Sequence, residues 1–183
     1  MPDRAPGVSP AGSVSATIWP MSSTEAGFFP RLVDERLVFP DLTGRTVEEV
    51  LAEMTRGLAR AGVVQDAEGV ARRLVERERM GSTGLGGGLA IPHCKVRELS
   101  DLVFAVGVSR GGVDFLAADG LPVTLIFLVL SPADAPALHL QALARISRVI
   151  RMPGVAERLH REETAEGIAA ALREAEGRLA VPV

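Results

Sequence analysis

Residues 123–130 form the longest apolar run in the chain, with one threonine as the only polar residue within it. A continuous apolar run of this length predicts a β-strand that is buried on both faces, rather than a strand with one face in water. Such a strand needs a layer of structure on each side, so it belongs near the centre of a layered fold. The run is also far too short to cross a lipid bilayer as a helix.

Two helices are predicted before the strands. Thr46 and Glu49 have the spacing of a capping box, and apolar residues follow at helical intervals until Gly62 ends the pattern. Asp66 is expected to cap a second helix that continues through Met80. Helices first, then strands mixed with helices, predict an α/β fold in which helices flank a mixed sheet of about five strands.

The second half of the chain completes this prediction. Residues 102–108 are expected to form a strand, and residues 113–120 turns and a short edge element. His139 is expected to open a helix that reaches about Arg151, before a short helical turn over residues 154–161. Thr164 is expected to cap the last helix.

Composition restricts the class of protein. The chain has 183 residues, a formal net charge of −3 and interspersed charges, which suits one globular domain and gives no indication of a nucleic-acid surface. A single cysteine excludes an intramolecular disulfide and favours a reducing cytoplasm. Residues 1–33 are rich in Pro, Gly, Ser and Ala, so we expect a disordered extension there and a folded domain over residues 34–178.

A glycine-rich segment precedes His93. Glycine occupies four of the five positions of residues 84–88, and a short apolar run then ends at Pro92. Glycine lets backbone N–H groups approach a ligand closely, as phosphate-cradling loops require. Pro92 cannot continue a strand ladder, so we expect His93 to leave a rigid strand end. An imidazole placed there suits a nucleophile near neutral pH, and we interpret His93 as a histidine that is itself phosphorylated.

The residues alone leave other interpretations open. A lone histidine is more often a surface or core residue, and glycine-rich loops also form ordinary turns. Arg77 could be a solvated charge at a helix end, and His139 could cap its helix. Cys94 and His139 could form a cysteine–histidine nucleophile pair, although no oxyanion-binding or third residue accompanies them. A metal site made by His93 and Cys94 is disfavoured, because adjacent residues on a strand point to opposite faces.

Two segments resemble the motifs of one family. Residues 76–93, which run through Met-Gly-Ser-Thr-Gly to Ile-Pro-His, resemble the active-site signature of type-2 IIA domains of the bacterial phosphoenolpyruvate-dependent phosphotransferase system. Residues 131–144 are similar to the second motif of that family, a histidine that opens a helix after a strand and loop. The resemblance covers roughly residues 34–176 and is greatest to the nitrogen-regulatory IIA proteins. Cys94 departs from the small residue common after the family's histidine.

The resemblance implies a phosphocarrier that needs no cofactor and no metal. His93 would accept a phosphoryl group from a histidine-phosphorylated carrier protein of the HPr or NPr kind. Arg77 matches the family's active-site arginine, and His139 matches its second histidine, which is not phosphorylated. We expect the remaining phosphoryl oxygens to be bound by hydroxyls and backbone N–H groups of Ser82, Thr83, Gly86, Gly87 and Gly88.

Two roles follow from the resemblance. A nitrogen-type regulatory protein would use phosphorylation to change which target protein it binds. A fructose- or mannitol-type IIA would instead pass its phosphate to a IIB domain during sugar transport. Neither role requires insertion into a membrane or binding to nucleic acid.

Overall fold

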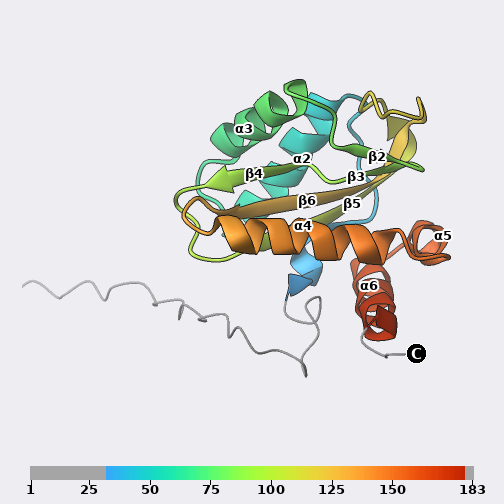
Figure 1. The fold of residues 1–183 in the computed structure, drawn as a ribbon. Helices are drawn as coiled ribbons and strands as arrows, with labels where there is room; N and C mark the ends of the chain where they lie inside the picture. The colour runs from blue at the N-terminus through green and yellow to red at the C-terminus, as the bar shows by residue number, and fades with distance from the viewer. Residues whose placement is uncertain (1–31, 180–183) are drawn as a thin grey trace, which may run out of the picture.

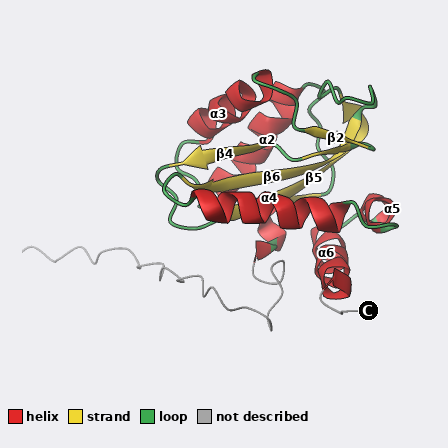
Figure 2. Ribbon diagram, in the orientation of Figure 1, coloured by secondary structure: helices red, strands yellow, loops and turns green. Residues whose placement is uncertain are grey.

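The computed structural model describes residues 32–179, and these form a mixed sheet with helices on both faces (Figure 1). Helices α2 (Val47–Arg60) and α3 (Ala67–Arg79) cover one face (Figure 2). Helices α4 (Pro136–Ile150), α5 (Val155–Arg161) and α6 (Ala165–Leu179) lie on the other side. The predicted fold class is therefore confirmed. No helix among the described residues is long and apolar enough to cross a membrane.

The sheet has six strands, one more than the approximate number predicted. They are β1 (Val38–Phe39), β2 (Gly84–Gly86), β3 (Leu89–Ala90), β4 (His93–Val96), β5 (Val103–Val113) and β6 (Val123–Pro132). Their order is β1-β5-β6-β3-β2, and β4 also pairs with β6. β6 runs antiparallel to β5 and parallel to β3 and β4. The strand expected to be central is therefore central.

Both faces of β6 are buried. Residues 125–130 have no exposed surface, and their side chains alternate between two apolar clusters. Leu125, Phe127 and Val129 pack with α4 and α6, whereas Leu128 and Leu130 pack with α2 and α3. The alternation follows from the two-residue period of a strand, and it fixes which helix layer each β6 side chain meets.

Strands β3 and β4 lie end to end along one edge of β6. Leu89 is in register with Leu125, and His93 is in register with Val129. Pro92 interrupts the ladder because it has no N–H to donate, although its carbonyl accepts from the Val129 N–H at 2.9 Å. The strand before Pro92 ends as expected, and His93 begins a further strand that was not predicted.

The N-terminal helices match their predicted caps. Thr46 and Glu49 make both hydrogen bonds of a capping box at the start of α2. The Asp66 carboxylate accepts from the Gly69 N–H at 2.7 Å and so caps α3. Arg77 lies in the last turn of α3, directly before the glycine-rich segment.

Three later boundaries differ from prediction. α4 begins at Pro136 rather than at His139, because proline with its fixed φ suits the first turn of a helix. β5 continues through an irregularity as far as Val113, so Gly111 and Gly112 lie within it. Residues 114–122 contain no strand, so the predicted edge element was wrong. The α5 turn and the Thr164 cap of α6, which accepts from the Gly167 N–H at 3.0 Å, are confirmed.

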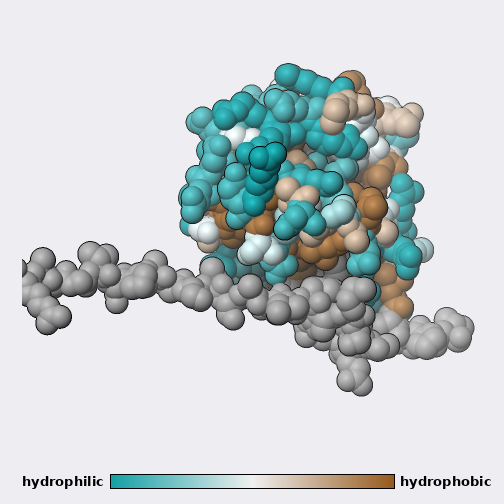
Figure 3. All heavy atoms as spheres, turned by 60° about the vertical axis from the view of Figure 1, so that its left-hand side comes forward, coloured by the Kyte–Doolittle hydropathy of each residue, from teal (hydrophilic) through white to brown (hydrophobic). Residues whose placement is uncertain are grey.

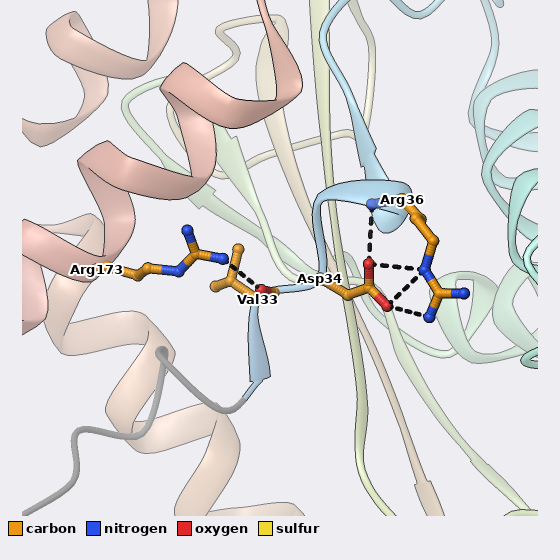
Figure 4. Close-up of polar contacts among 4 residues, drawn as sticks. All are labelled: Val33, Asp34, Arg36 and Arg173. Carbon is orange, nitrogen blue, oxygen red and sulfur yellow. Dashed lines mark hydrogen bonds and ion pairs between the residues drawn. The ribbon is translucent and has the colours of Figure 1, made fainter.

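The chain enters the fold beside α6. Val33 is buried, and its carbonyl oxygen accepts from the Arg173 guanidinium at 3.0 Å (Figure 4). Asp34 caps the 3-10 turn η1 (Glu35–Leu37) and forms an ion pair with Arg36 at 2.6 Å. Residues 1–31, which make up most of the predicted extension, lie outside the described residues, so the division at residue 33 stays a prediction.

Candidate functional site

His93 is held by two hydrogen bonds that define its protonation. Its Nδ1 lies 2.8 Å from the Ile91 carbonyl oxygen, and the Arg77 Nε–H donates to its Nε2 at 3.3 Å. A carbonyl can only accept, so Nδ1 carries the proton. A guanidinium can only donate, so Nε2 presents a lone pair. The site therefore contains a neutral imidazole whose nucleophilic nitrogen is Nε2.

The electrostatic setting of His93 favours this neutral form. Burial is the main cause that lowers the pKa of His93, and the nearby Arg77 cation lowers it further. The Ile91 hydrogen bond and the Glu78 carboxylate oppose the shift, but the net direction remains downward. A neutral ring keeps its lone pair available at neutral pH, as a nucleophile requires.

Arg77 reaches the site from the last turn of α3. Besides its contact with His93, it donates to the Gly81 carbonyl oxygen at 2.9 Å. This second bond uses a terminal nitrogen and orients the planar guanidinium at the edge of the imidazole. The group can bind two oxygens of one anion at once, so Arg77 is placed to bind an oxyanion attached to Nε2.

His139 lies beside His93, on the α4 side of the sheet. The two ring centres are 5.2 Å apart, with the planes tilted by 57°. His139 is 8 % exposed, and its Nδ1 lies 2.7 Å from the Ser131 hydroxyl. Burial is the main cause that lowers the pKa of His139, and the neighbouring His93, Lys95 and Arg77 act in the same direction. Its backbone N–H already bonds to Ala135, so His139 does not cap the helix.

A cavity of about 360 Å³ opens on one side of His93. Its lining combines the site residues with an apolar wall from α4: Arg77, Ser82, Thr83, Leu85, Ile91, His93, Leu143, Ala144 and Ser147. His139 does not line this cavity, and its ring contacts the His93 ring outside the cavity. A group attached to His93 would therefore meet both Arg77 and the hydroxyl-bearing loop.

Ser82 and Thr83 already make hydrogen bonds within the protein. The Ser82 hydroxyl donates to the Phe115 carbonyl oxygen at 2.5 Å and accepts from the Gly84 N–H at 3.0 Å. Thr83 donates through its N–H and its hydroxyl to the two oxygens of Glu78, at 2.7 and 2.5 Å. Glu78 thereby fixes the loop that follows α3.

The glycine triplet lies outside the lining of the cavity at His93. Gly86, Gly87 and Gly88 all have positive φ; Gly86 ends β2, and Gly87 and Gly88 form the turn to β3. The Gly87 N–H donates to the Asp119 carboxylate at 2.7 Å. None of the three lines the cavity, so the structure brings together His93, Arg77, Ser82 and Thr83 and leaves these glycines in the turn.

Cys94 lies on the opposite side of the sheet from the histidines. It packs in the apolar cluster beneath α2 and α3, and burial raises the pKa of its thiol to about 12. Such a thiol carries almost no thiolate at neutral pH. The alternative of a nucleophile pair between Cys94 and His139 is therefore wrong. No group of three or more metal-binding side chains occurs among residues 32–179.

Two polar residues of this region were not recognised from the sequence as part of the site. Ser131 contacts His139, and Lys95 adds positive charge near it. Glu78, which the sequence left as either an orienting or a solvated residue, holds Thr83. The alternation of β6 could have placed Ser131 on the α4 face with Val129. No sequence motif indicates which histidine nitrogen it would meet.

The end of the molecule that Figure 3 brings toward the viewer is largely hydrophilic, with hydrophobic patches between polar side chains.

Comparison with known proteins gives a consistent result. The family model for the phosphoenolpyruvate-dependent sugar phosphotransferase system, EIIA 2, matches residues 31–175. A nitrogen regulatory protein of Pseudomonas aeruginosa is 37% identical over 128 residues, which cover 70% of this chain and 83% of that protein. The fructose-specific EIIABC component of Bacillus subtilis is 31% identical over 137 residues, 75% of this chain but 22% of that longer protein.

A solved structure agrees with these relatives. The nitrogen regulatory protein IIA-Ntr of Neisseria meningitidis superposes with a TM-score of 0.71 and 30% identity, covering 78% of this chain and 97% of that one. The region that the family model matches, residues 31–175, contains the whole sheet and both His93 and His139.

Proposed function

Since this chain belongs to the type-2 IIA family of the phosphoenolpyruvate-dependent sugar phosphotransferase system, we propose that His93 is its phosphoryl-accepting residue. The observation that carries the proposal is the neutral His93 ring, with Nδ1–H bound to Ile91 and the Nε2 lone pair facing Arg77. A histidine-phosphorylated carrier protein would supply the phosphoryl group, and no metal or cofactor takes part.

The transfer of the phosphoryl group between the two imidazoles needs no net gain or loss of a proton. The Nε2 lone pair of His93 attacks the phosphorus, a new N–P bond forms, and the N–P bond on the carrier breaks. The electron pair of that bond returns to the carrier's imidazole, whose other nitrogen carries a proton, so that a neutral ring leaves. Nδ1 of His93 keeps its proton and its hydrogen bond to the Ile91 carbonyl oxygen throughout, so the ring needs no separate base. Positioning and charge stabilisation then supply most of the catalysis.

Positive charge around Nε2 stabilises the transferred group. A phosphoryl group on nitrogen brings close to two negative charges and three acceptor oxygens. Arg77 exchanges its contact with Nε2 for two of these oxygens, because its fork matches their spacing. His139 supplies another donor, and Lys95, two residues along β4, adds a cation on the same side of the strand. Ser82 and Thr83 could bind the third oxygen only by exchanging their present partners.

We favour a regulatory role of the nitrogen type. A phosphoryl group on His93 changes the charge of the surrounding surface, which alters which partner can dock. The similarity to nitrogen regulatory proteins along most of their length supports this role. The similarity to a fructose-specific component supports the alternative, in which His93 passes its phosphate to a IIB domain. Both roles place the protein in the cytoplasm, where phosphoenolpyruvate is available.

Phosphorylation in a reconstituted system tests the proposal. With phosphoenolpyruvate, the first enzyme of the system and a carrier protein, we expect one acid-labile phosphate per chain. His93→Ala should abolish the label. His160→Ala is the matched control, because this histidine binds Thr124 away from the cavity and should be dispensable. A label that persists in His93→Ala would assign the nucleophile to another residue. Rapid onward transfer to a purified IIB domain would favour the transport role.

A further inference from the structure

We infer that Ser131 is a positioning residue that holds His139 as the Nε2–H tautomer, with that N–H available to the phosphoryl group on His93. The reaction in which it acts rests on the proposed function. The tautomer itself rests only on the contacts around His139. Neither the family comparison nor the two histidine motifs assigns a role to this serine.

Ser131 is placed by the register between two strands. It is paired with Lys95 of β4, two positions beyond the pair formed by His93 and Val129. The two-residue period of a strand puts Ser131 and Val129 on the same face, toward α4. Ser131 is completely buried, and its hydroxyl lies 2.7 Å from Nδ1 of His139. The contact therefore joins the sheet that carries His93 to the helix that carries His139.

The direction of this hydrogen bond follows from what else the hydroxyl can reach. Among residues 32–179, Nδ1 of His139 is the hydrogen-bond partner of the Ser131 hydroxyl. If the hydroxyl accepted a hydrogen bond from Nδ1–H, its own hydrogen would be buried without an acceptor, which is unfavourable. The hydroxyl therefore donates, Nδ1 keeps its lone pair, and the ring proton is on Nε2.

This tautomer gives His139 a defined function without a charge. With Nδ1 occupied by Ser131, Nε2–H is the donor left for a ligand. The His93 ring centre is 5.2 Å away, which places a phosphoryl group on His93 within reach of the neighbouring ring. A neutral donor costs less to desolvate than a charged one, and a fixed ring does not need to reorient during transfer.

Ser131 also suits the state that follows transfer. The negative phosphoryl group favours a protonated His139, in which Nδ1 becomes a donor as well. A hydroxyl can rotate and accept from that Nδ1–H, since it is both donor and acceptor. Ser131 can therefore keep the ring orientation in both protonation states, which an alanine cannot do.

The test combines a spectrum with kinetics. Two-bond ¹H–¹⁵N spectra of the unphosphorylated protein should show His139 with its proton on Nε2 and Nδ1 as an acceptor. Ser131→Ala should slow phosphoryl transfer about tenfold, as expected when one oriented donor is lost. Ser131→Ala/His139→Ala should be no slower than His139→Ala alone, because the serine acts only through that ring. Ser131→Thr keeps the hydroxyl and should restore most of the rate.

Ser109→Ala is the matched control. Ser109 lies in β5, is completely buried, and its hydroxyl has no hydrogen-bond partner in the described chain. Its removal takes the same atom from the same sheet without touching His139, so transfer should stay within about twofold of wild type. A spectrum with the proton on Nδ1 overturns the inference, even if Ser131→Ala does not fold. An equal slowing by Ser131→Ala with and without His139 also overturns it. Failure of wild type to accept phosphate would instead overturn the proposed function, while the spectrum still decides the tautomer.

Discussion

The two faces of β4 differ in burial and polarity, although successive residues of the strand alternate between them. His93 and Lys95 lie on the side of the histidine pair and keep contact with solvent. Cys94 and Val96 are buried in the apolar cluster under α2 and α3. A separation of one residue therefore divides the reactive site from the core, because strand side chains alternate.

The difference shows how this fold can hold the proposed nucleophile in place while leaving it half-buried. The core side of β4 anchors the strand by packing, and parallel pairing with β6 fixes its register. The site side then presents His93 between Arg77 from α3 and His139 from α4. Two neighbouring nucleophilic residue types thus behave differently. His93 keeps a lone pair in a polar setting, whereas burial raises the pKa of Cys94 to about 12.

The sharpest way to break this comparison is to put the same charge on each face. Cys94→Asp places a carboxylate among apolar side chains without a partner, so we expect a loss of about 3–5 kcal/mol in the free energy of unfolding. Lys95→Asp makes the same residue at the next, exposed position, and stability should change by no more than about 0.5 kcal/mol. Urea denaturation at neutral pH measures both, and equal losses would contradict the assignment of the faces.

A second prediction concerns the site face alone. Arg77→Lys keeps the positive charge but replaces the planar fork with a point charge. We expect phosphoryl transfer to His93 to slow by about tenfold to a hundredfold, which corresponds to the loss of one charged hydrogen bond. The thermal midpoint should change little, because the guanidinium bonds only to His93 and Gly81 among residues 32–179.

Arg79→Lys provides the control for that measurement. Arg79 lies in the same helical turn, but it is largely exposed and lies 3.7 Å from Glu48 at the surface. Single-turnover rates measured by rapid quench should match wild type for this variant. Comparable slowing by both substitutions would mean that total charge, not the geometry of Arg77, governs transfer.

The helices and the central strand could be predicted because local signals and burial agree there. Thr46, Asp66 and Thr164 cap helices as their spacing indicates. The strand at His93 could not be predicted in the same way. Pro92 is a local stop signal, whereas β4 exists because β6 offers it a second stretch of ladder beyond the break. Pairing between distant segments overrode the local signal.

The site divides along the same line. His93, Arg77 and His139 come together as their motifs indicate. Ser131 remained hidden, because its role depends on which nitrogen of His139 faces the sheet, a consequence of helix packing rather than of spacing. The glycines showed the reverse problem. Their composition suggests a phosphate cradle, but a tight turn between short strands requires positive φ as well, and Gly86–Gly88 satisfy that need.

The smallest expected effect is the pH dependence of stability on the site face. The folded-state pKa values of His93 and His139 lie below the ordinary value, chiefly because of burial. The unfolded chain therefore binds more protons below about pH 6.5, so stability present above that pH is lost as pH falls. Because His93 is only half-buried, water screens the effect, and we expect the free energy of unfolding to change by less than about 1 kcal/mol between pH 6.5 and 5.

His93→Ala/His139→Ala should flatten the curve of unfolding free energy against pH over this interval. His160→Ala should flatten it separately, because burial also lowers the pKa of this third histidine. A slope unchanged in the double variant would show that the two rings are not held neutral by the fold, and that the site face is as wet as the surface around it.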